Sequence, residues 1–296
     1  MRGIIEVSVN VRGPSKDLHS GVDGGAVFEP LLDLVAIVST LVNSNGRIAV
    51  PGFYDGVPRL SQSEKATFDA IELDLEKYMK ALGVTQLTAS TPSEILDARW
   101  RQPALSVLHV DTAHHGDSKH AFSTVESDAE SESVRHTWGH AVTQHSLPRC
   151  GGMSVIPKSA SAIISIRFVP NQKAEELVLK LETHLKHEFA KRQSPNKLGF
   201  SLTKQGEWWL GDRSNELYSN AHTAIQRVWK QEPLYVREGG TMPLTPILER
   251  LLNAPAIHIP LGQCSDGAHL PNERIKAENL IQGKNVLREF IALFKP

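Results

Sequence analysis

The chain has 296 residues, with 32 lysines and arginines against 33 aspartates and glutamates, so its formal net charge is −1. Hydrophobic residues make up 40% and charged residues 22%, a balance typical of globular domains. These figures exclude a strongly basic nucleic-acid binder, an acidic solvating tail and a collagen-like fibre, and the length favours about two domains.

The cysteine count and the ends of the chain bear on its location. Cys150 and Cys264 are too few for a disulfide framework, which favours a reducing, cytoplasmic setting. No run approaches the roughly 18 apolar residues of a membrane span, so we expect no membrane partner. Because the sequence opens directly inside a strand-like segment, with no leader before it, we expect a truncated or short form of a longer protein.

The first half of the chain contains a strand, a loop, helices and a second strand. From position 5 apolar and polar residues alternate, which predicts a half-buried strand. Helical periodicity and turn residues then predict a loop at 17–25, helices over 27–43 and 62–82, and an apolar strand over 104–110. Residues 111–148 form a low-complexity stretch rich in Ser, Asp and Glu, which we expect to be a disordered insertion.

The second half continues with strands at 154–156 and 160–169, an amphipathic helix at 173–192 and a strand at 198–204. The tail then alternates helix and strand. Its predicted elements are helices at 216–229 and 244–252, an apolar strand at 256–261, a polar loop at 262–273 and a helix at 276–294. We therefore predict an α/β protein, with an α+β two-layer unit in the middle and an α/β layer at the C-terminal end.

The polar loop after the apolar strand is the first candidate site. Ligands collect at the carboxyl ends of strands in open α/β sheets, and Asp266, His269 and Glu273 could supply a metal ligand or an acid–base group there. The alternative is a polar loop whose histidine caps the next helix. From spacing alone the structural interpretation is favoured about two to one.

Two further segments suggest an anion site. Gly240 and Thr241 stand in a Gly-Gly turn before a helix, where backbone N–H groups and a hydroxyl could hold an anion, although plain turn chemistry explains the same residues. Arg167 lies between apolar residues of a strand. Its planar donor fork suits a substrate carboxylate, and a solvated sheet face is an equally good explanation.

Two histidines need separate treatment. His19, in a turn-rich loop, could donate a hydrogen bond to a developing oxyanion, but a lone loop histidine is more often structural. His109 and Asp111 form a His-x-Asp triplet, which can begin a metal site. No second carboxylate cluster follows it, so we interpret His109 as a strand residue and not as a ligand.

Taken together, these segments resemble one family, the carnosinase-like zinc metallodipeptidases of the aminoacylase and carboxypeptidase G group. The resemblance covers nearly the whole chain except the insertion. The blocks that carry it are KDLHSGV at 16–22, WRQPALS at 100–106, IPK at 156–158, SIRFVP at 165–170, REGGTMP at 237–243 and DGAHLPNE at 266–273. The sequences CGGM at 150–153 and GQCS at 262–265 also resemble a fungal subunit of a glutathione-degrading complex, which implies γ-glutamyl or Cys-Gly substrates.

The resemblance implies a split α/β catalytic domain with two zinc ions and an inserted lid domain that pairs two subunits. It places the end strand of the catalytic domain at 1–7, the lid at 8–205 and the C-terminal part of the catalytic domain at 206–296. It further implies a homodimer, and we also expect an amidotransferase-like partner subunit.

Residue by residue, His269 matches a zinc ligand, and His19 matches the lid histidine that reaches the partner's site and stabilises the oxyanion. Arg167 matches the arginine that holds the substrate's carboxylate. Ser154 and Thr241 match small hydroxyl positions that contact the substrate. Gln205 departs from the family, which has a second lid histidine there, and this puts substrate specificity in doubt.

The remaining metal ligands of the family would lie upstream of residue 1, so we expect an incomplete metal site, since even one catalytic zinc usually takes about three protein ligands. Two interpretations follow. The chain is a fragment or short form of a zinc-dependent peptidase, or it is a non-catalytic dimerisation or scaffold subunit. A nucleic-acid role is disfavoured by the near-zero net charge and the lack of a basic aromatic stripe.

Overall fold

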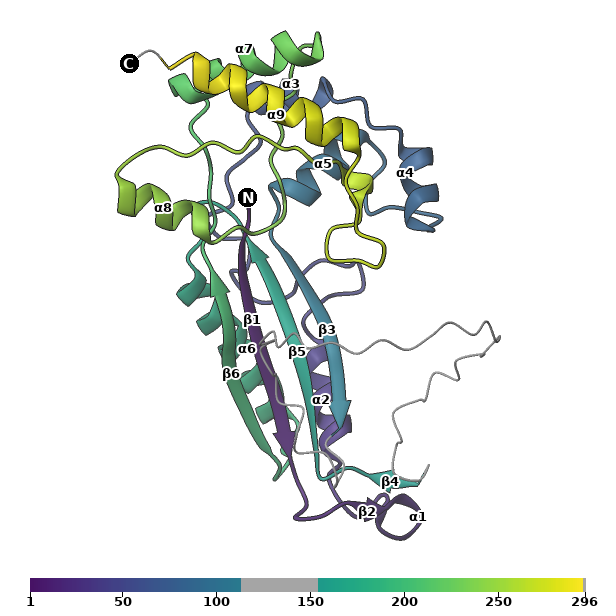
Figure 1. The fold of residues 1–296 in the computed structure, drawn as a ribbon. Helices are drawn as coiled ribbons and strands as arrows, with labels where there is room; N and C mark the ends of the chain where they lie inside the picture. The colour runs from purple at the N-terminus through teal and green to yellow at the C-terminus, as the bar shows by residue number, and fades with distance from the viewer. Residues whose placement is uncertain (113–153, 295–296) are drawn as a thin grey trace, which may run out of the picture.

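The computed structural model describes residues 1–112 and 154–294, and an antiparallel four-stranded sheet forms its centre, in the order β3-β5-β1-β6 (Figure 1). Each neighbouring pair of strands runs antiparallel, and β1 pairs with both β5 and β6. The four strands are β1 (Gly3–Arg12), β3 (Ala104–Thr112), β5 (Ser159–Phe168) and β6 (Lys197–Gly206).

Alternation along β1 decides which face of the sheet is buried. Every second residue from Ile5 to Val11 is fully buried, whereas the polar residues between them are only half-buried. Successive side chains of a strand point to opposite faces, so one face of the sheet carries the core and the other stays open. The predicted half-buried strand is confirmed.

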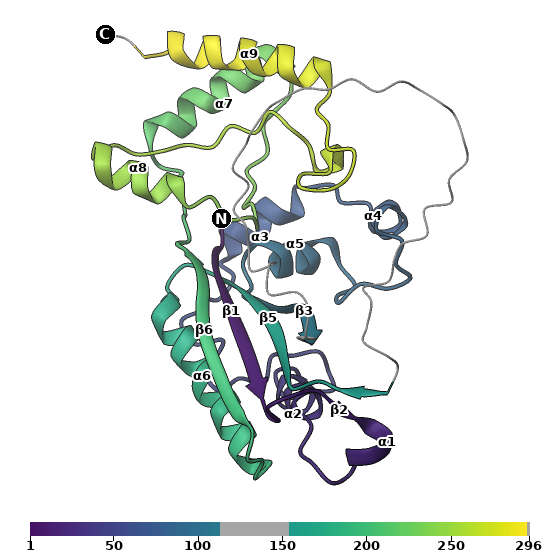
Figure 2. The same ribbon diagram turned by 60° about the horizontal axis from the view of Figure 1, so that its bottom comes forward.

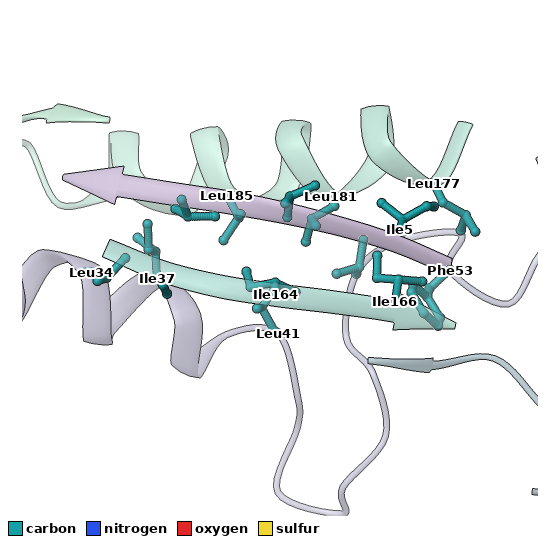
Figure 3. Close-up of a cluster of buried hydrophobic side chains, with 14 of the residues drawn as sticks. Ile5, Leu34, Ile37, Leu41, Phe53, Ile164, Ile166, Leu177, Leu181 and Leu185 are labelled. Carbon is teal, nitrogen blue, oxygen red and sulfur yellow. The ribbon is translucent and has the colours of Figure 1, made fainter. Parts of the chain in front are cut away.

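Two helices cover the apolar face. Figure 3 shows Leu34 and Ile37 of α2 (Pro30–Ser39) at one end of the buried layer, Ile164 of β5 farther along it, and Leu181 of α6 (Ala174–Lys191) facing the same layer. Each of these side chains is at most 1% exposed, and full burial of such a side chain stabilises the fold by about 1.5–3 kcal/mol. The predicted α+β two-layer unit is therefore present. Its first helix is shorter than expected because Pro30 begins it and Thr40 ends it.

The helix predicted over 62–82 is wrong in one respect, because it is two helices, α3 (Gln62–Asp69) and α4 (Leu75–Leu82). The carboxylate of Asp74 accepts a hydrogen bond from the backbone N–H of Lys77 at 3.0 Å and so starts a new helix where the periodicity alone indicated continuation. A third helix, α5 (Pro92–Trp100), follows and begins with a capping box of Thr91 and Glu94.

A small second sheet lies at the far end of the central one. It pairs β2 (Leu18–His19) with β4 (Val155–Ile156), and the short helix α1 (Ser20–Asp23) follows β2 directly. Figures 1 and 2 both place these elements beyond one end of the central sheet and α7, α8 and α9 beyond the other. The predicted insertion at 111–148 lies outside the described residues except for its first two, which complete β3.

The C-terminal region contains the helices α7 (Glu216–Trp229), α8 (Leu244–Leu252) and α9 (Ala277–Ala292), with α7 packed on α9. The predicted bounds of α7 and α8 are confirmed. The strand predicted at 256–261 is wrong: the segment pairs with no strand of the described residues. An apolar run becomes a strand only where a neighbour can satisfy its backbone groups, and the described sheets lie elsewhere.

The expected domain boundaries stay predictions. β1 continues without a break through the boundary expected between residues 7 and 8, and β6 ends at Gly206, beside the boundary expected after residue 205. Within the described ranges, no helix combines the length and apolar character needed to cross a membrane.

Candidate functional site

Arg167 is the penultimate residue of β5, opposite Ile4 of β1 and Ala104 of β3. Its neighbours Ile166 and Phe168 are buried in the core on the helix-covered face. Because side chains alternate across a strand, Arg167 lies on the open face, half-buried at the end of the sheet. The sequence left a solvated sheet face and a substrate-carboxylate site equally open, and the role of Arg167 stays a prediction.

The guanidinium of Arg167 is held by one hydroxyl. Arg167 Nη1 donates a hydrogen bond to Thr241 Oγ1, and Thr241 Oγ1 donates its own hydrogen to the backbone oxygen of Arg2 at 2.8 Å. A hydroxyl has one hydrogen to give, so this chain fixes which way the Thr241 hydroxyl points. No carboxylate of the described residues lies within ion-pair distance of Arg167. Arg167 and Thr241, predicted separately, thus lie together.

Gly240 lies next to this pair, and its backbone N–H contacts a carboxylate of the chain itself. The backbone N–H of Gly240 donates to Glu238 Oε1 at 3.0 Å, and α8 begins only at Leu244. The turn therefore holds the Glu238 carboxylate instead of leaving backbone N–H groups open at a helix start.

The loop at 262–273 contains the short helix η1 (Cys264–Asp266). Asp266 is buried; its Oδ2 accepts from the backbone N–H of Gln263 at 2.9 Å, and its Oδ1 has no hydrogen-bond partner among the described residues. His269 is exposed, with a left-handed φ of 62°, and its backbone N–H donates to Glu273 Oε2 at 3.3 Å. Asp266 thus organises the loop, while the imidazole of His269 faces outward.

A catalytic metal ion needs about three protein ligands that lie close together. In residues 1–112 and 154–294, no three His, Cys, Asp or Glu side chains lie close enough together to hold a metal ion. The described residues therefore do not fit the pair of zinc ions that the resemblance implies, and His269 stands without a second ligand from that part of the chain.

His19 and Ser154 meet at the opposite end of the molecule. His19 pairs with Val155 across the small sheet, and the backbone N–H of Ser20 donates to the oxygen of Ser154 at 2.7 Å. His19 caps α1: its Nδ1 accepts from the N–H of Gly21 at 3.0 Å. An accepting Nδ1 places the proton of the neutral imidazole on Nε2, so exposed His19 presents a hydrogen-bond donor to whatever faces it.

The distance between the two ends follows from the sheet itself. Arg167 and Ser159 lie eight residues apart on β5, which corresponds to roughly 26 Å at about 3.3 Å per residue. The small sheet with His19 lies beyond the Ser159 end, as Figures 1 and 2 both show. Within one chain, His19 therefore lies far from Arg167 and Thr241.

Two arginines at the Arg167 end received no role from the sequence. Arg2 contacts Thr241, yet a single arginine before a strand matches no motif. Arg101 lies in the block at 100–106 that carries the resemblance, and its side chain is 1% exposed and pairs with Asp97 at 2.7 Å and Glu64 at 3.5 Å. Glu64 also pairs with Arg237 at 2.8 Å, which connects α3 to the loop before α8.

A separate cavity of about 730 Å³ lies between β6 and α8. Its lining includes Gln205 but none of Arg167, Thr241, His19 and His269. Gln205, the position that departs from the family, is exposed and donates to Glu175 Oε1 at 2.9 Å. Other lining groups pair with one another, such as Trp209 Nε1 with Glu249 at 2.8 Å, so we assign this cavity no chemistry.

Comparison with known proteins identifies the class. The family model described as "Peptidase dimerisation domain" matches residues 1–193, so the chain belongs to the metallopeptidase family that carries this domain. Among its relatives, the Cys-Gly metallodipeptidase dug1 of Schizosaccharomyces pombe is 34% identical over 283 residues, covering 96% of this chain and 52% of the relative. The human Beta-Ala-His dipeptidase is 32% identical over 289 residues, covering 98% and 50%.

Solved structures agree. The dipeptidase Dug1p of Saccharomyces cerevisiae matches with a TM-score of 0.80 and 30% identity, over 98% of this chain and 54% of that one. Human carnosine dipeptidase 1 matches with a TM-score of 0.79 and 32% identity, over 98% and 54%. The expected family and fold class are confirmed. The chain spans about half the length of the curated relatives it matches.

Proposed function

We propose that the chain is part of a metallodipeptidase that hydrolyses a dipeptide or small amide with a free carboxylate. Arg167 carries the proposal: its half-buried guanidinium is bonded to Thr241 and to no carboxylate of the described residues. A cation partly removed from water favours an anion, and a planar fork matches a carboxylate. The names of the relatives, Cys-Gly and Beta-Ala-His dipeptidases, supply the substrate class.

We assign His19 a role as a hydrogen-bond donor that the other subunit of a homodimer supplies to the site. Its Nε2–H faces outward, and it lies roughly 26 Å or more from Arg167 of the same chain. A dimerisation domain offers the means to bring the two together in pairs. There the imidazole would stabilise the negative charge that develops on the carbonyl oxygen as the peptide bond is attacked.

Zinc as the metal, with His269 as a ligand, is proposed from the resemblance, and the described side chains by themselves do not form the zinc site. A glutathione-related substrate, substrate contacts from Ser154 and Gly240, and an amidotransferase-like partner subunit are proposals on the same basis. The cytoplasmic location is a proposal from the small number of cysteines.

The test measures hydrolysis of Cys-Gly by an active full-length protein that contains this chain, and by its variants. His19→Ala should lower kcat by about 10²–10³-fold, as loss of an oxyanion donor does, with little loss of bound metal. His109→Ala, on the exposed part of β3, is the matched control and should leave kcat unchanged. An unchanged kcat for His19→Ala would remove His19 from the site.

The alternative is a scaffold subunit that pairs chains without catalysis, and the matched dimerisation domain is compatible with it. Metal analysis after dialysis separates the two. Stoichiometric zinc together with peptidase activity would exclude the scaffold. Absence of both, with activity restored by an upstream extension of the chain, would support a fragment, whereas a stable dimer that stays inactive with the extension would support the scaffold.

A further inference from the structure

Arg2 joins three segments at the end of the sheet that carries Arg167. Its Nε donates to the backbone oxygen of Gly239 at 3.0 Å, and its Nη1 donates to the backbone oxygen of Gln102 at 3.2 Å. Its own backbone oxygen accepts the hydroxyl hydrogen of Thr241 at 2.8 Å. One residue therefore connects the start of β1, the turn before β3 and the loop that presents Thr241.

The loop is packed tightly against this arginine. A Cβ added to Gly239 would lie 2.4 Å from the backbone oxygen of Arg99 and 3.1 Å from Arg2 Nη2. Side chains do not tolerate the first distance, so the loop can approach the segment before β3 only because residue 239 is glycine. The contact holds Thr241 in one place relative to Arg2.

Arg2 also places a second positive charge beside Arg167. Burial, with the neighbouring charge of Arg167, lowers the pKa of Arg2 to about 10, so Arg2 stays protonated at neutral pH. Of the described residues, no carboxylate forms an ion pair with either guanidinium, and the nearby Glu238 instead accepts from the N–H of Gly240. The charge of Glu238 partly offsets the burial of Arg2 without a direct ion pair, so a bound anion would supply a direct partner for the two half-buried cations.

We propose that Arg2 is a positioning residue of the carboxylate site, acting through Thr241. By taking the Thr241 hydrogen on its backbone oxygen and clamping the 239–241 loop with its guanidinium, it turns the Thr241 oxygen toward Arg167. Arg167 then has one donor fixed and its other donors oriented for a substrate carboxylate. The inference rests on the proposed role of Arg167 in binding that carboxylate.

The position requires the shape of arginine and not only its charge. A lysine keeps the positive charge but is a single point donor, and it cannot reach two carbonyl oxygens in the planar arrangement that Nε and Nη1 use. Arg2→Lys therefore separates positioning from charge: positioning predicts a loss, and a purely electrostatic role predicts none.

The experiment titrates the full chain with N-acetylglycine and with N-acetylglycinamide by calorimetry or NMR. Wild type should prefer the acid, and Arg167→Met should abolish that preference. Arg2→Lys and Arg2→Met should each weaken acid binding about 10-fold and leave amide binding unchanged. Arg12→Met removes the same residue type from the opposite end of β1 and should bind the acid like wild type.

Thr241→Val provides a second test that leaves Arg2 in place, since it removes the hydroxyl at nearly constant size. It should weaken acid binding by the same factor, and combining it with Arg2→Lys should add little, because both changes break one chain of contacts. Wild-type acid affinity in Arg2→Lys or in Thr241→Val, with Arg167→Met defective, would overturn the inference alone. A wild type with no preference for the acid would overturn the proposed function and this inference with it.

Discussion

The two-layer unit and the C-terminal region use similar amphipathic helices but bury them very differently. In the two-layer unit, Leu181 and Leu185 of α6 are at most 1% exposed because the sheet lies directly against them. In the C-terminal region, Leu251 of α8 is 75% exposed and Ile291 of α9 is 67% exposed. A periodic apolar pattern therefore predicts a helix, whereas burial of that helix depends on a partner surface.

The C-terminal region does have a small core of its own. Ala221 and Ala224 of α7 and Val286 of α9 are buried where these helices cross. Gly283 of α9 allows Leu261 of the preceding segment to approach closely, because an added Cβ would lie 2.4 Å from Leu261 Cδ2. The contact is narrow, and its residues are small. We therefore expect this region to be held less strongly than the two-layer unit.

Hydrogen exchange would show the largest contrast. Backbone amides of Val7 and Val9 in β1 should exchange only through global unfolding, whereas those of α8 should exchange through local opening, at least about 10³-fold faster. Exchange is measured by mass spectrometry on the intact chain. Equal protection in the two regions would contradict the comparison.

Truncating matched leucines tests the same contrast by mutation. Leu181→Ala should cost about 2–5 kcal/mol of unfolding free energy, because it opens a cavity in the core. Leu251→Ala, on the exposed face of α8, should change stability by no more than about 0.5 kcal/mol. Urea denaturation measures both. A large cost for Leu251→Ala would show that α8 is covered in solution.

The two regions also differ in how deeply their ion pairs are buried. Asp33, whose side chain is 1% exposed, accepts from Arg192 at 2.6 Å, Ser194 at 2.5 Å and Asn196 at 2.8 Å. Asp33→Asn should therefore cost about 1.5–3 kcal/mol. Glu207 pairs with Arg250 at an exposed position of the C-terminal region, and Glu207→Gln should cost no more than about 0.5 kcal/mol.

The pH dependence of Asp33 has a definite sign. Burial opposes ionisation of this group, but hydrogen bonds from Ser194, Arg192 and Asn196 outweigh it and hold its pKa below the usual value. Its stabilising effect is therefore complete above about pH 4, the unfolded value, and is lost as the pH falls through the lower folded pKa. Acid unfolding of wild type and Asp33→Asn should converge there, and curves that stay parallel would contradict this.

The smallest effect concerns two half-buried histidines, one in each region. Burial lowers the pKa of His184 in α6 and of His258 before the 262–273 loop. A lowered folded pKa stabilises the protein above about pH 6.5, and this contribution is lost as the pH falls below that value. His184→Gln and His258→Gln should each reduce the change in unfolding free energy between pH 7 and pH 5, as measured by urea denaturation at the two pH values. Each reduction should be smaller than the cost of Asp33→Asn.

Local patterns predicted the helices and strands of the two-layer unit well, because each apolar stripe found its partner within the chain. The strand expected at 256–261 failed for the opposite reason, since periodicity cannot show whether a neighbouring strand exists. The break before Asp74 was missed because a single capping side chain overrode the apparent helical run.

The candidate site was predictable only in part. Arg167, Thr241 and His19 stood out because their residue types and surroundings matched a known family. That Arg167 and Thr241 touch, and that His19 lies at the other end, depends on the antiparallel register of β1 and β5, which spacing along the chain does not reveal. Arg2 acts through its backbone oxygen as much as its side chain, and no sequence pattern marks that role.

The length of β5 between Ser159 and Arg167 means that variants of the proposed shared site should complement one another in mixed dimers. A mixed dimer of one Arg167→Met subunit and one His19→Ala subunit contains one site with both residues and one site with neither. Two variants that are each inactive alone should therefore recover activity when their subunits are exchanged. If each site were built within a single chain, the mixture would remain inactive.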